Sequence, residues 1–317
     1  MSESPVLSNE PANRKESAAQ AVDTVDMADA VDKADAVGAV EGSALRPRRR
    51  RLRPGVGVAV GLGILVVLVA MAYVAPLIRP FSANEVAGAP FAAPNGTHWL
   101  GTDDLGRDYF VRLCVAGRTS LSIALAGSVL ALVAGSAVGF AAGVGGRWLD
   151  TLLMGGVDLM LSFPSLLLGL AAVTVFSPST TTLIAVLSFV SLPHFARIVR
   201  ARCLEVRELE FVLSARISGV PSFVIVLKHL LPNVLPLMMV QLANSAAIVI
   251  LLESALSYLG LGVQPPTPSW GRMIAEAQNY LTDSPWLVLG AGGALLLSSV
   301  AWGLIGEGFA ISRRSVV

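Results

Sequence analysis

The chain has 317 residues, of which 54% are hydrophobic and only 14% are charged, and its mean hydropathy is +0.69. This composition excludes an ordinary soluble globular protein and predicts an all-α polytopic membrane protein. The net charge of +1 points to no charged partner, and two cysteines argue against a disulfide scaffold or a cysteine-rich metal site.

The first 45 residues form a separate acidic segment. Nine acidic and three basic side chains give it a net charge of −6, and it has no aromatic residue. Such a segment buries too little apolar surface to offset the entropy lost on ordering, so we expect a disordered cytoplasmic tail. Aspartates at every third position from 23 to 35 leave a short amphipathic helix as the alternative.

Residues 46–120 are predicted to contain a basic anchor, a first transmembrane helix and an extracytoplasmic segment. Six arginines at 46–53 directly precede the apolar run 55–78. An arginine run can bind nucleic acid, but its place beside an apolar run favours a cytoplasmic anchor that contacts membrane lipid, without a nucleic-acid partner. The run exceeds the roughly 20 residues needed to cross a bilayer, so the N-terminus is predicted to be cytoplasmic.

The segment 80–120 is polar, broken by Gly and Pro, and predicted to be extracytoplasmic. It contains GTDD from residue 101 and GRD from residue 106. Asp103, Asp104 and Asp108 are close enough in sequence to suggest a metal site or an acid/base pair. Helix capping and surface turns are the more usual use of such residues, and we expect that role here.

Residues 121–312 are predicted to form a core of five more transmembrane helices, and 313–317 a cytoplasmic C-terminus. The second span is rich in small residues that allow close helix approach. Its members are Gly127, Ser128, Ala134, Gly135, Ser136, Gly139 and Gly143. The five further spans are expected at about 121–144, 149–175, 182–196, 235–263 and 286–311. The span at 182–196, which is the fourth of the chain, is short and is interrupted by Pro193 and His194.

Four polar residues in these spans are candidates for the pathway or for contacts between helices. They are Asp158, Gln241, Asn244 and Glu253. An ionisable residue in a span is a functional candidate by default, although Asp158 can instead cap a helix or pair with an arginine. His194 lacks other ligands at metal-binding spacing. Cys114 is expected outside and Cys203 inside, so that they cannot pair within the chain.

The polar stretch 210–233 lies between apolar runs and is predicted to form a helix, a turn and a second helix. Residues 210–217 make about two helical turns, and Gly219 and Pro221 break the helix. The second helix is expected to stop at Leu-Pro-Asn, residues 231–233. A short hairpin across the cytoplasmic ends of the spans suits docking to another protein, and an ordinary loop between spans is the alternative.

This stretch resembles the EAA loop of ABC-importer permeases of the dipeptide and oligopeptide (DppC/OppC) type. The matching residues are Glu210, Phe211, Val212, Ala215, Arg216, Gly219, His229, Leu231, Pro232 and Asn233. Leu213 and Ser214 stand where that family usually has Glu and Ala. Residues 98–113 and 253–271 are similar to two further signatures of the same permeases, whereas Gly306 to Phe309 lack the family's Arg-Asp tail. The resemblance covers about residues 55–312.

The resemblance implies a type I ABC-importer permease with six transmembrane helices and both termini cytoplasmic, in the cell inner (plasma) membrane. It implies a second homologous permease subunit, two ABC ATPase subunits and an extracytoplasmic solute-binding protein that delivers di- or oligopeptides. The ATPases would dock on Glu210, Ala215, Arg216, Gly219, His229, Pro232 and Asn233. ATP and Mg would be bound by those partner subunits, with no cofactor or metal in this chain.

The chain has no phosphate loop, because none of its three lysines follows the required glycine run, and no hydrolase motif. We therefore expect a transport subunit with no catalytic residue of its own. Alternatives are a permease for nickel or another small solute, an ion-coupled secondary transporter, and a purely structural subunit of a membrane assembly. A secondary transporter would be expected to show internal repeats and paired intramembrane charges.

Overall fold

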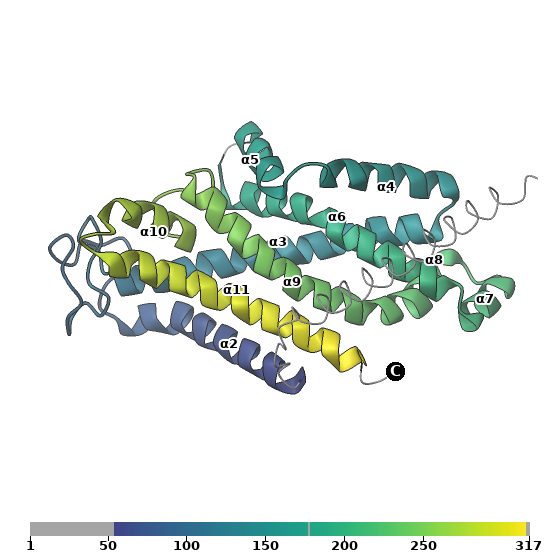
Figure 1. Cartoon of the computed structure of the whole chain (residues 1–317), viewed down its shortest axis with the longest axis horizontal. Helices are drawn as coiled ribbons and strands as arrows, with labels where there is room; N and C mark the ends of the chain where they lie inside the picture. The colour runs from purple at the N-terminus through teal and green to yellow at the C-terminus, as the bar shows by residue number, and fades with distance from the viewer. Residues whose placement is uncertain (1–53, 177, 315–317) are drawn as a thin grey trace, which may run out of the picture. The chain divides into compact units, whose positions relative to one another are not determined.

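The computed structural model describes residues 54–176 and 178–314, and side chains for 55–176 and 178–310. The expected acidic tail, the arginine cluster at 46–53 and residues 315–317 lie outside the described residues. Within the described residues the regular structure is helical, apart from two isolated β-bridges (Figure 1). The helices are α2 (Pro54–Ile78), α3 (Tyr109–Val144), α4 (Arg147–Leu161), α5 (Ser165–Val175), α6 (Thr180–Arg207), α7 (Glu210–Ile217), α8 (Ser222–Ile225), the π-helical segment η1 (Val226–Leu230), α9 (Leu231–Tyr258), α10 (Trp270–Ala277), the 3₁₀ segment η2 (Gln278–Tyr280) and α11 (Pro285–Arg314).

Five helices among the described residues are long and apolar enough to cross a membrane: α2, α3, α6, the continuous α8–η1–α9 and α11. The bent pair α4 and α5 brings the number to six if it counts as one span. The all-helical prediction is therefore confirmed, and five or six spans agree with a polytopic membrane protein.

The third expected span is not one straight helix. The α4 and α5 helices meet at 94° across Ser162, Phe163 and Pro164. Pro164 has no N–H to donate and disfavours a helical conformation in the residue before it. The N–H of Ser162 donates to the carbonyls of Asp158 and Leu159, which closes the end of α4.

Two helices are longer than their expected spans. The α3 helix begins at Tyr109 because the side chain of Asp108 caps it, accepting the N–H of Val111 at 3.0 Å. This confirms the capping role for Asp108, although it turns residues 109–120 into helix. The α6 helix continues through Pro193 to Arg207, so the expected interruption is wrong.

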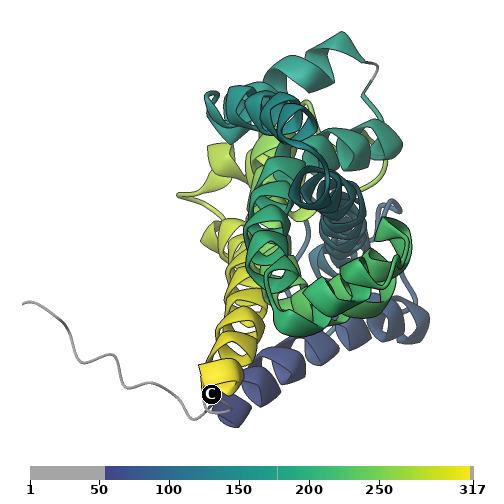
Figure 2. The same cartoon turned by 90° about the vertical axis from the view of Figure 1, so that its right-hand side faces the viewer.

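Close contact between α3 and α6 forms the centre of the helical packing. A Cβ added at Gly135 would lie 2.6 Å from the carbonyl oxygen of Leu192, and one at Gly139 would lie 2.7 Å from that of Ala196. These contacts confirm that small residues on α3 allow the helices to approach. The α9 helix packs on both, while α2 pairs with α11 on one side and α4 and α5 lie on the other (Figure 2).

The loop 79–108 and α10 lie at one end of the long helices, and α7 and α8 lie at the other (Figure 1). We call these the loop end and the hairpin end. Cys114 belongs to α3 near the loop end, and Cys203 belongs to α6 near the hairpin end. Both are buried and neither forms a disulfide.

Candidate functional site

The stretch predicted to form a hairpin does so at its first helix and turn. The α7 helix spans Glu210–Ile217, as expected. It ends in a Schellman motif, in which the N–H of Gly219 donates to the carbonyl of Arg216 at 3.0 Å and the N–H of Val220 to that of Ala215 at 3.1 Å. Gly219 has φ +75°, a conformation that favours glycine, and a Cβ there would have no neighbour within 4 Å. Gly219 is therefore required by the turn and not by packing within this chain.

The predicted stop at Leu231 to Asn233 is wrong. The chain stays helical from Ser222 to Tyr258, passing through the π-helical segment η1 into α9. Pro232 lies in the first turn of α9, where a missing N–H is tolerated. The hairpin and α9 are thus joined by continuous helix, not by a loop.

An apolar cluster anchors the hairpin to the ends of two long helices. Val212 of α7, Ile225 of α8 and Leu230 of η1 are buried against Cys203 and Val206 of α6. The α3 helix contributes Phe140 and Val144 to the same cluster. The hairpin is therefore held against α3 and α6 by packed side chains.

The outer face of the hairpin carries apolar and charged side chains together. Ile217 is 87% exposed and Phe223 is 71% exposed, on either side of the turn. Arg216 and Lys228 are exposed beside them. Exposed apolar groups gathered with charges typify a surface that binds another protein.

The residues expected to dock an ATPase all lie on this hairpin or at its junction with α9. Glu210, Arg216 and Gly219 are exposed, and Ala215 is half-buried. His229 is half-buried, with its ring 5.9 Å from that of Phe211. Pro232 and Asn233 are exposed, and the Nδ2 of Asn233 donates to the carbonyl of His229 at 2.7 Å.

The candidate pathway residues lie apart from the hairpin and from one another. Asp158 of α4 forms an ion pair with Arg197 of α6 at 2.6 Å, with side chains 61% and 59% exposed. On α9, Gln241 is half-buried and Asn244 is exposed. The Asn244 Oδ1 would lie 2.4 Å from a Cβ at Gly306, so Asn244 contacts α11.

Glu253 is fully buried and belongs to a cluster of serine hydroxyls. Its Oε1 accepts the hydroxyl of Ser257 at 2.7 Å, and its Oε2 accepts that of Ser254 at 3.2 Å. The hydroxyls of Ser120 on α3 and Ser269 before α10 also hydrogen-bond this carboxyl. Glu253 is therefore enclosed within the chain, as expected of a residue that contacts other helices.

The serine hydroxyls that surround Glu253 also tie down the loop that follows α9. Ser257 accepts the N–H of Val263 at 3.2 Å, and Ser120 accepts the N–H of Trp270 at 3.2 Å. Ser269 caps α10 by accepting the N–H of Arg272. In each of these bonds the backbone N–H is the donor and the serine oxygen is the acceptor. Each serine can therefore donate its own hydroxyl proton to the Glu253 carboxyl. The signature 253–271 is thus one structural unit, and the i,i+4 spacing of Glu253 and Ser257 is its only local signal.

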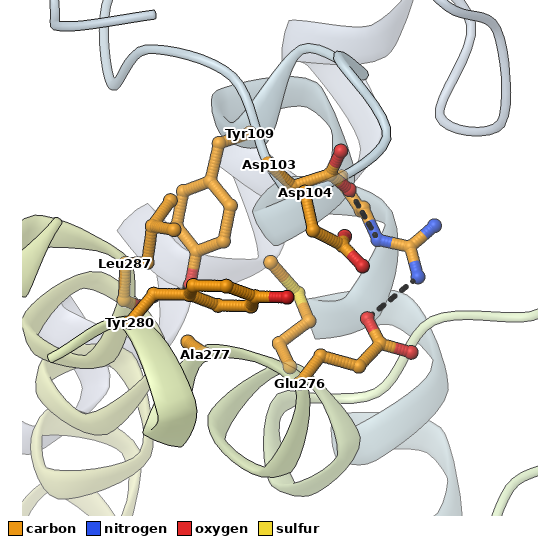
Figure 3. Close-up of a pocket in the computed structure, with 9 residues that line it drawn as sticks. Asp103, Asp104, Tyr109, Glu276, Ala277, Tyr280 and Leu287 are labelled. Atoms are coloured by element: carbon orange, nitrogen blue, oxygen red, sulfur yellow. Dashed lines mark hydrogen bonds and ion pairs between the residues drawn. The ribbon is translucent and has the colours of Figure 1, made fainter. Parts of the chain in front are cut away.

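A second group that sequence reasoning missed is an ion-pair network at the loop end (Figure 3). Arg112 is buried and lies 3.1 Å from the Glu276 carboxylate and 3.5 Å from that of Asp103. Arg107 lies 2.6 Å from Asp103. Burial, and after it the charge of Asp103, raises the pKa of the Asp104 carboxyl above its ordinary value, against the opposing effect of Arg107.

The network lines a pocket too small for a substrate. Asp103, Asp104, Tyr109, Arg112, Glu276 and Tyr280 surround it (Figure 3). Its enclosed volume is about 10 Å³, which is room for about one water molecule. The Tyr109 hydroxyl donates to the carbonyl of Leu287, which joins α3 to α11. This arrangement holds the loop end together.

Comparison with known proteins agrees with this architecture. Residues 135–308 match the family described as binding-protein-dependent transport system inner membrane component. The chain is 36% identical over 241 residues to the dipeptide transport system permease protein DppC of Alkalihalophilus pseudofirmus, covering 76% of this chain and 79% of that protein. It is 38% identical over 236 residues to a putative peptide permease protein of Brucella suis biovar 1, covering 74% and 78%. The chain therefore belongs to the family of inner membrane components of binding-protein-dependent transport systems.

Proposed function

We propose that this chain is the permease subunit of an ATP-driven ABC importer and forms half of the translocation pathway for di- and oligopeptides. The observation that carries the proposal is the identity of 36–38% to named peptide permeases over about three quarters of the chain. A second, homologous permease subunit supplies the other half of the pathway. An extracytoplasmic binding protein delivers the peptide.

The first helix and the turn of the hairpin, Glu210–Phe223, are the docking site for an ABC ATPase, which binds ATP and Mg on its own residues. This places the hairpin end and both termini in the cytoplasm and the loop end outside. The exposed Ile217 and Phe223 beside Arg216 support this role, because they offer apolar contact area with a charged rim. The anchoring of Val212 against α6 supports a lever, because closure of the ATPases then moves α3 and α6 together.

The face shared by α4 and α6 near Asp158 and Arg197 borders the aqueous pathway. Both side chains are more than half exposed, and an ion pair is costly to place against lipid. A water-filled pathway or the second permease subunit solvates such a pair. The half-buried Gln241 of α9 is a further candidate for the pathway, whereas Asn244 contacts α11 and the buried Glu253 does not take part.

The docking role is tested with substitutions on the exposed tip. Ile217→Glu is expected to leave the amount of protein in the membrane unchanged and to reduce co-purified ATPase at least tenfold, because a carboxylate replaces the most exposed apolar contact. Leu105→Glu is the matched control, since Leu105 is 55% exposed at the loop end. Equal ATPase recovery from both variants would contradict the docking site.

Gly219→Glu is expected to insert normally and to uncouple ATP hydrolysis from uptake. Because Gly219 has φ +75°, Gly219→Asn is the control, as asparagine tolerates this conformation. Normal uptake by Gly219→Glu would show that the turn is not at the docking surface. Loss of uptake by both variants would show that turn geometry alone is responsible.

The cargo is tested in proteoliposomes that contain the co-purified complex. ATP hydrolysis is measured with the binding protein and a dipeptide, a longer peptide or Ni²⁺. Stimulation by peptides alone is expected, and stimulation by Ni²⁺ alone would assign the metal as cargo instead. Uptake driven by a proton or sodium gradient without ATP would reject the ABC importer.

A further inference from the structure

The buried residues that lead from the hairpin into α9 are spaced for a helix with one extra residue. Ile225, Leu230, Val234 and Met238 are at most 6% exposed and follow one another at intervals of five, four and four. In an α-helix, residues four apart share a face, whereas residues five apart differ by about 140°. A continuous α-helix would therefore turn Ile225 out of the apolar cluster that anchors the hairpin.

The π-helical segment η1 corrects this register. The N–H of Leu231 donates to the carbonyl of Val226, five residues back, so Ile225 and Leu230 both face the cluster. Such turns contain one residue more than an α-turn and often occur at functional sites. Here the turn lies between two apolar clusters, one that anchors the hairpin on α3 and α6 and one in which Val234 and Met238 of α9 pack against the same two helices.

Pro232 and Asn233 account for the stability of this turn. Pro232 has no N–H, so the α-helical bond to the carbonyl of Lys228 cannot form. The Nδ2 of Asn233 donates to the carbonyl of His229 at 2.7 Å, which satisfies a group inside the π segment. The His-Leu-Leu-Pro-Asn sequence at 229–233 therefore favours the π turn over a regular α-turn.

We propose that Pro232 and Asn233 are positioning residues, which hold the π turn of η1 and thereby set the orientation of the hairpin relative to α9. In this role they act within the chain and do not contact the ATPase. Conversion of the π turn to an α-turn would rotate the hairpin by about 100° and shift it by about 1.5 Å relative to α9. The turn is then the joint through which hairpin movement reaches α9, an inference that rests on the proposed docking of an ATPase.

Removal of Leu227 tests the joint directly. Leu227 is 46% exposed, and its deletion leaves Ile225 and Leu230 four residues apart, so that the buried stripe is kept in a regular α-helix. Because the stripe is kept, the orientation of the hairpin relative to α9 is kept as well, and the deletion variant is expected to retain its ATPase subunits and to stay within twofold of the wild type in peptide taken up per ATP hydrolysed. A loss of at least tenfold with normal ATPase recovery would overturn the proposal that the turn acts by setting this orientation.

Two substitutions at Asn233, one serving as the control for the other, test the role of the turn without a deletion. Asn233→Asp keeps the shape but removes the N–H donor, and Asn233→Ser keeps a donor that can reach the carbonyl four residues back. We expect the Asp variant to lose at least fivefold in uptake per ATP with normal ATPase recovery, and the Ser variant to stay within twofold of the wild type. Equal coupling in the two variants would overturn the proposal, including when the deletion variant does not fold.

Amide hydrogen exchange over residues 226–234 tests the role of Asn233 in the turn independently of the proposed ATPase docking. Faster exchange in Asn233→Asp than in Asn233→Ser is expected whether or not an ATPase binds, and equal exchange would overturn the role of Asn233. Failure of the wild type to retain ATPase subunits would instead reject the proposed docking, while exchange would still report on the turn.

Discussion

Replacing Glu253 with glutamine puts an amide NH₂ where one carboxylate oxygen accepts hydroxyl groups. Oε1 accepts Ser257 at 2.7 Å and Oε2 accepts Ser254 at 3.2 Å, so either orientation of the amide leaves a hydroxyl facing a donor. Losing a buried hydrogen bond costs about 1 kcal/mol, and an unsatisfied buried donor costs about 1–3 kcal/mol. We therefore expect Glu253→Gln to lower the free energy of unfolding by about 3 kcal/mol.

The effect is measured as the thermal unfolding midpoint of the detergent-purified complex at a fixed heating rate. With an unfolding entropy of about 2.1 cal/mol/K per residue, 1 kcal/mol corresponds to about 1.5 °C for a chain of this size, so the Tm is expected to fall by about 4–5 °C. Glu307→Gln is the control, because Glu307 is exposed and the chemical change is the same. A Tm of Glu253→Gln within about 1 °C of the wild type would refute an acceptor-only role of the Glu253 carboxyl.

Three further predictions concern packing and charge. Gly61→Val is expected to lower the stability by about 1–3 kcal/mol because a Cβ there would lie 2.6 Å from the carbonyl oxygen of Ala301. Gly63→Val is its control, with no neighbour within 4 Å, and equal Tm values would contradict the α2–α11 contact. Arg112→Met removes the buried arginine that joins Asp103 to Glu276, although Asp103 keeps Arg107 and Glu276 keeps Arg272, and it is expected to cost about 1–3 kcal/mol; limited proteolysis of the loop end should then accelerate, and an unchanged rate would contradict the network. Because the pKa of Asp104 is raised in the folded protein, its charge destabilises the fold at neutral pH, and this cost is relieved as pH falls through the raised pKa. The Tm of the wild type should therefore rise relative to Asp104→Asn between neutral pH and about pH 4, and parallel Tm curves would contradict the shift.

Local patterns predicted the helical fold and most of the hairpin. Apolar runs indicated the long helices, because a span needs about 20 apolar residues wherever its partners lie. The α7 helix ends where Gly219 and Pro221 predicted, since a Schellman turn needs one residue with positive φ. Asp108 caps α3 for an equally local reason, which is the reach of its side chain to an N–H three residues on.

At two proline positions the sequence did not show which structure would form. Pro164 lies within the expected span 149–175, for which no break was predicted, and the structure bends there by 94° between α4 and α5. The Leu-Pro-Asn stretch at 231–233 indicated a stop, whereas the chain continues as helix. A π turn absorbs the proline there because Ile225 and Leu230 must both reach the same apolar cluster.

The sequence by itself determined that the long apolar segments are helical, where α7 begins and ends, and which family signatures the chain carries. Only the tertiary structure decided that Glu253 is buried among serines, because Ser120 and Ser269 come from segments distant in the chain. It likewise decided that Arg112 joins the loop end to Glu276. Hydropathy and capping depend on neighbours along the chain, whereas a buried carboxylate or guanidinium must find its partners wherever the packed helices bring them.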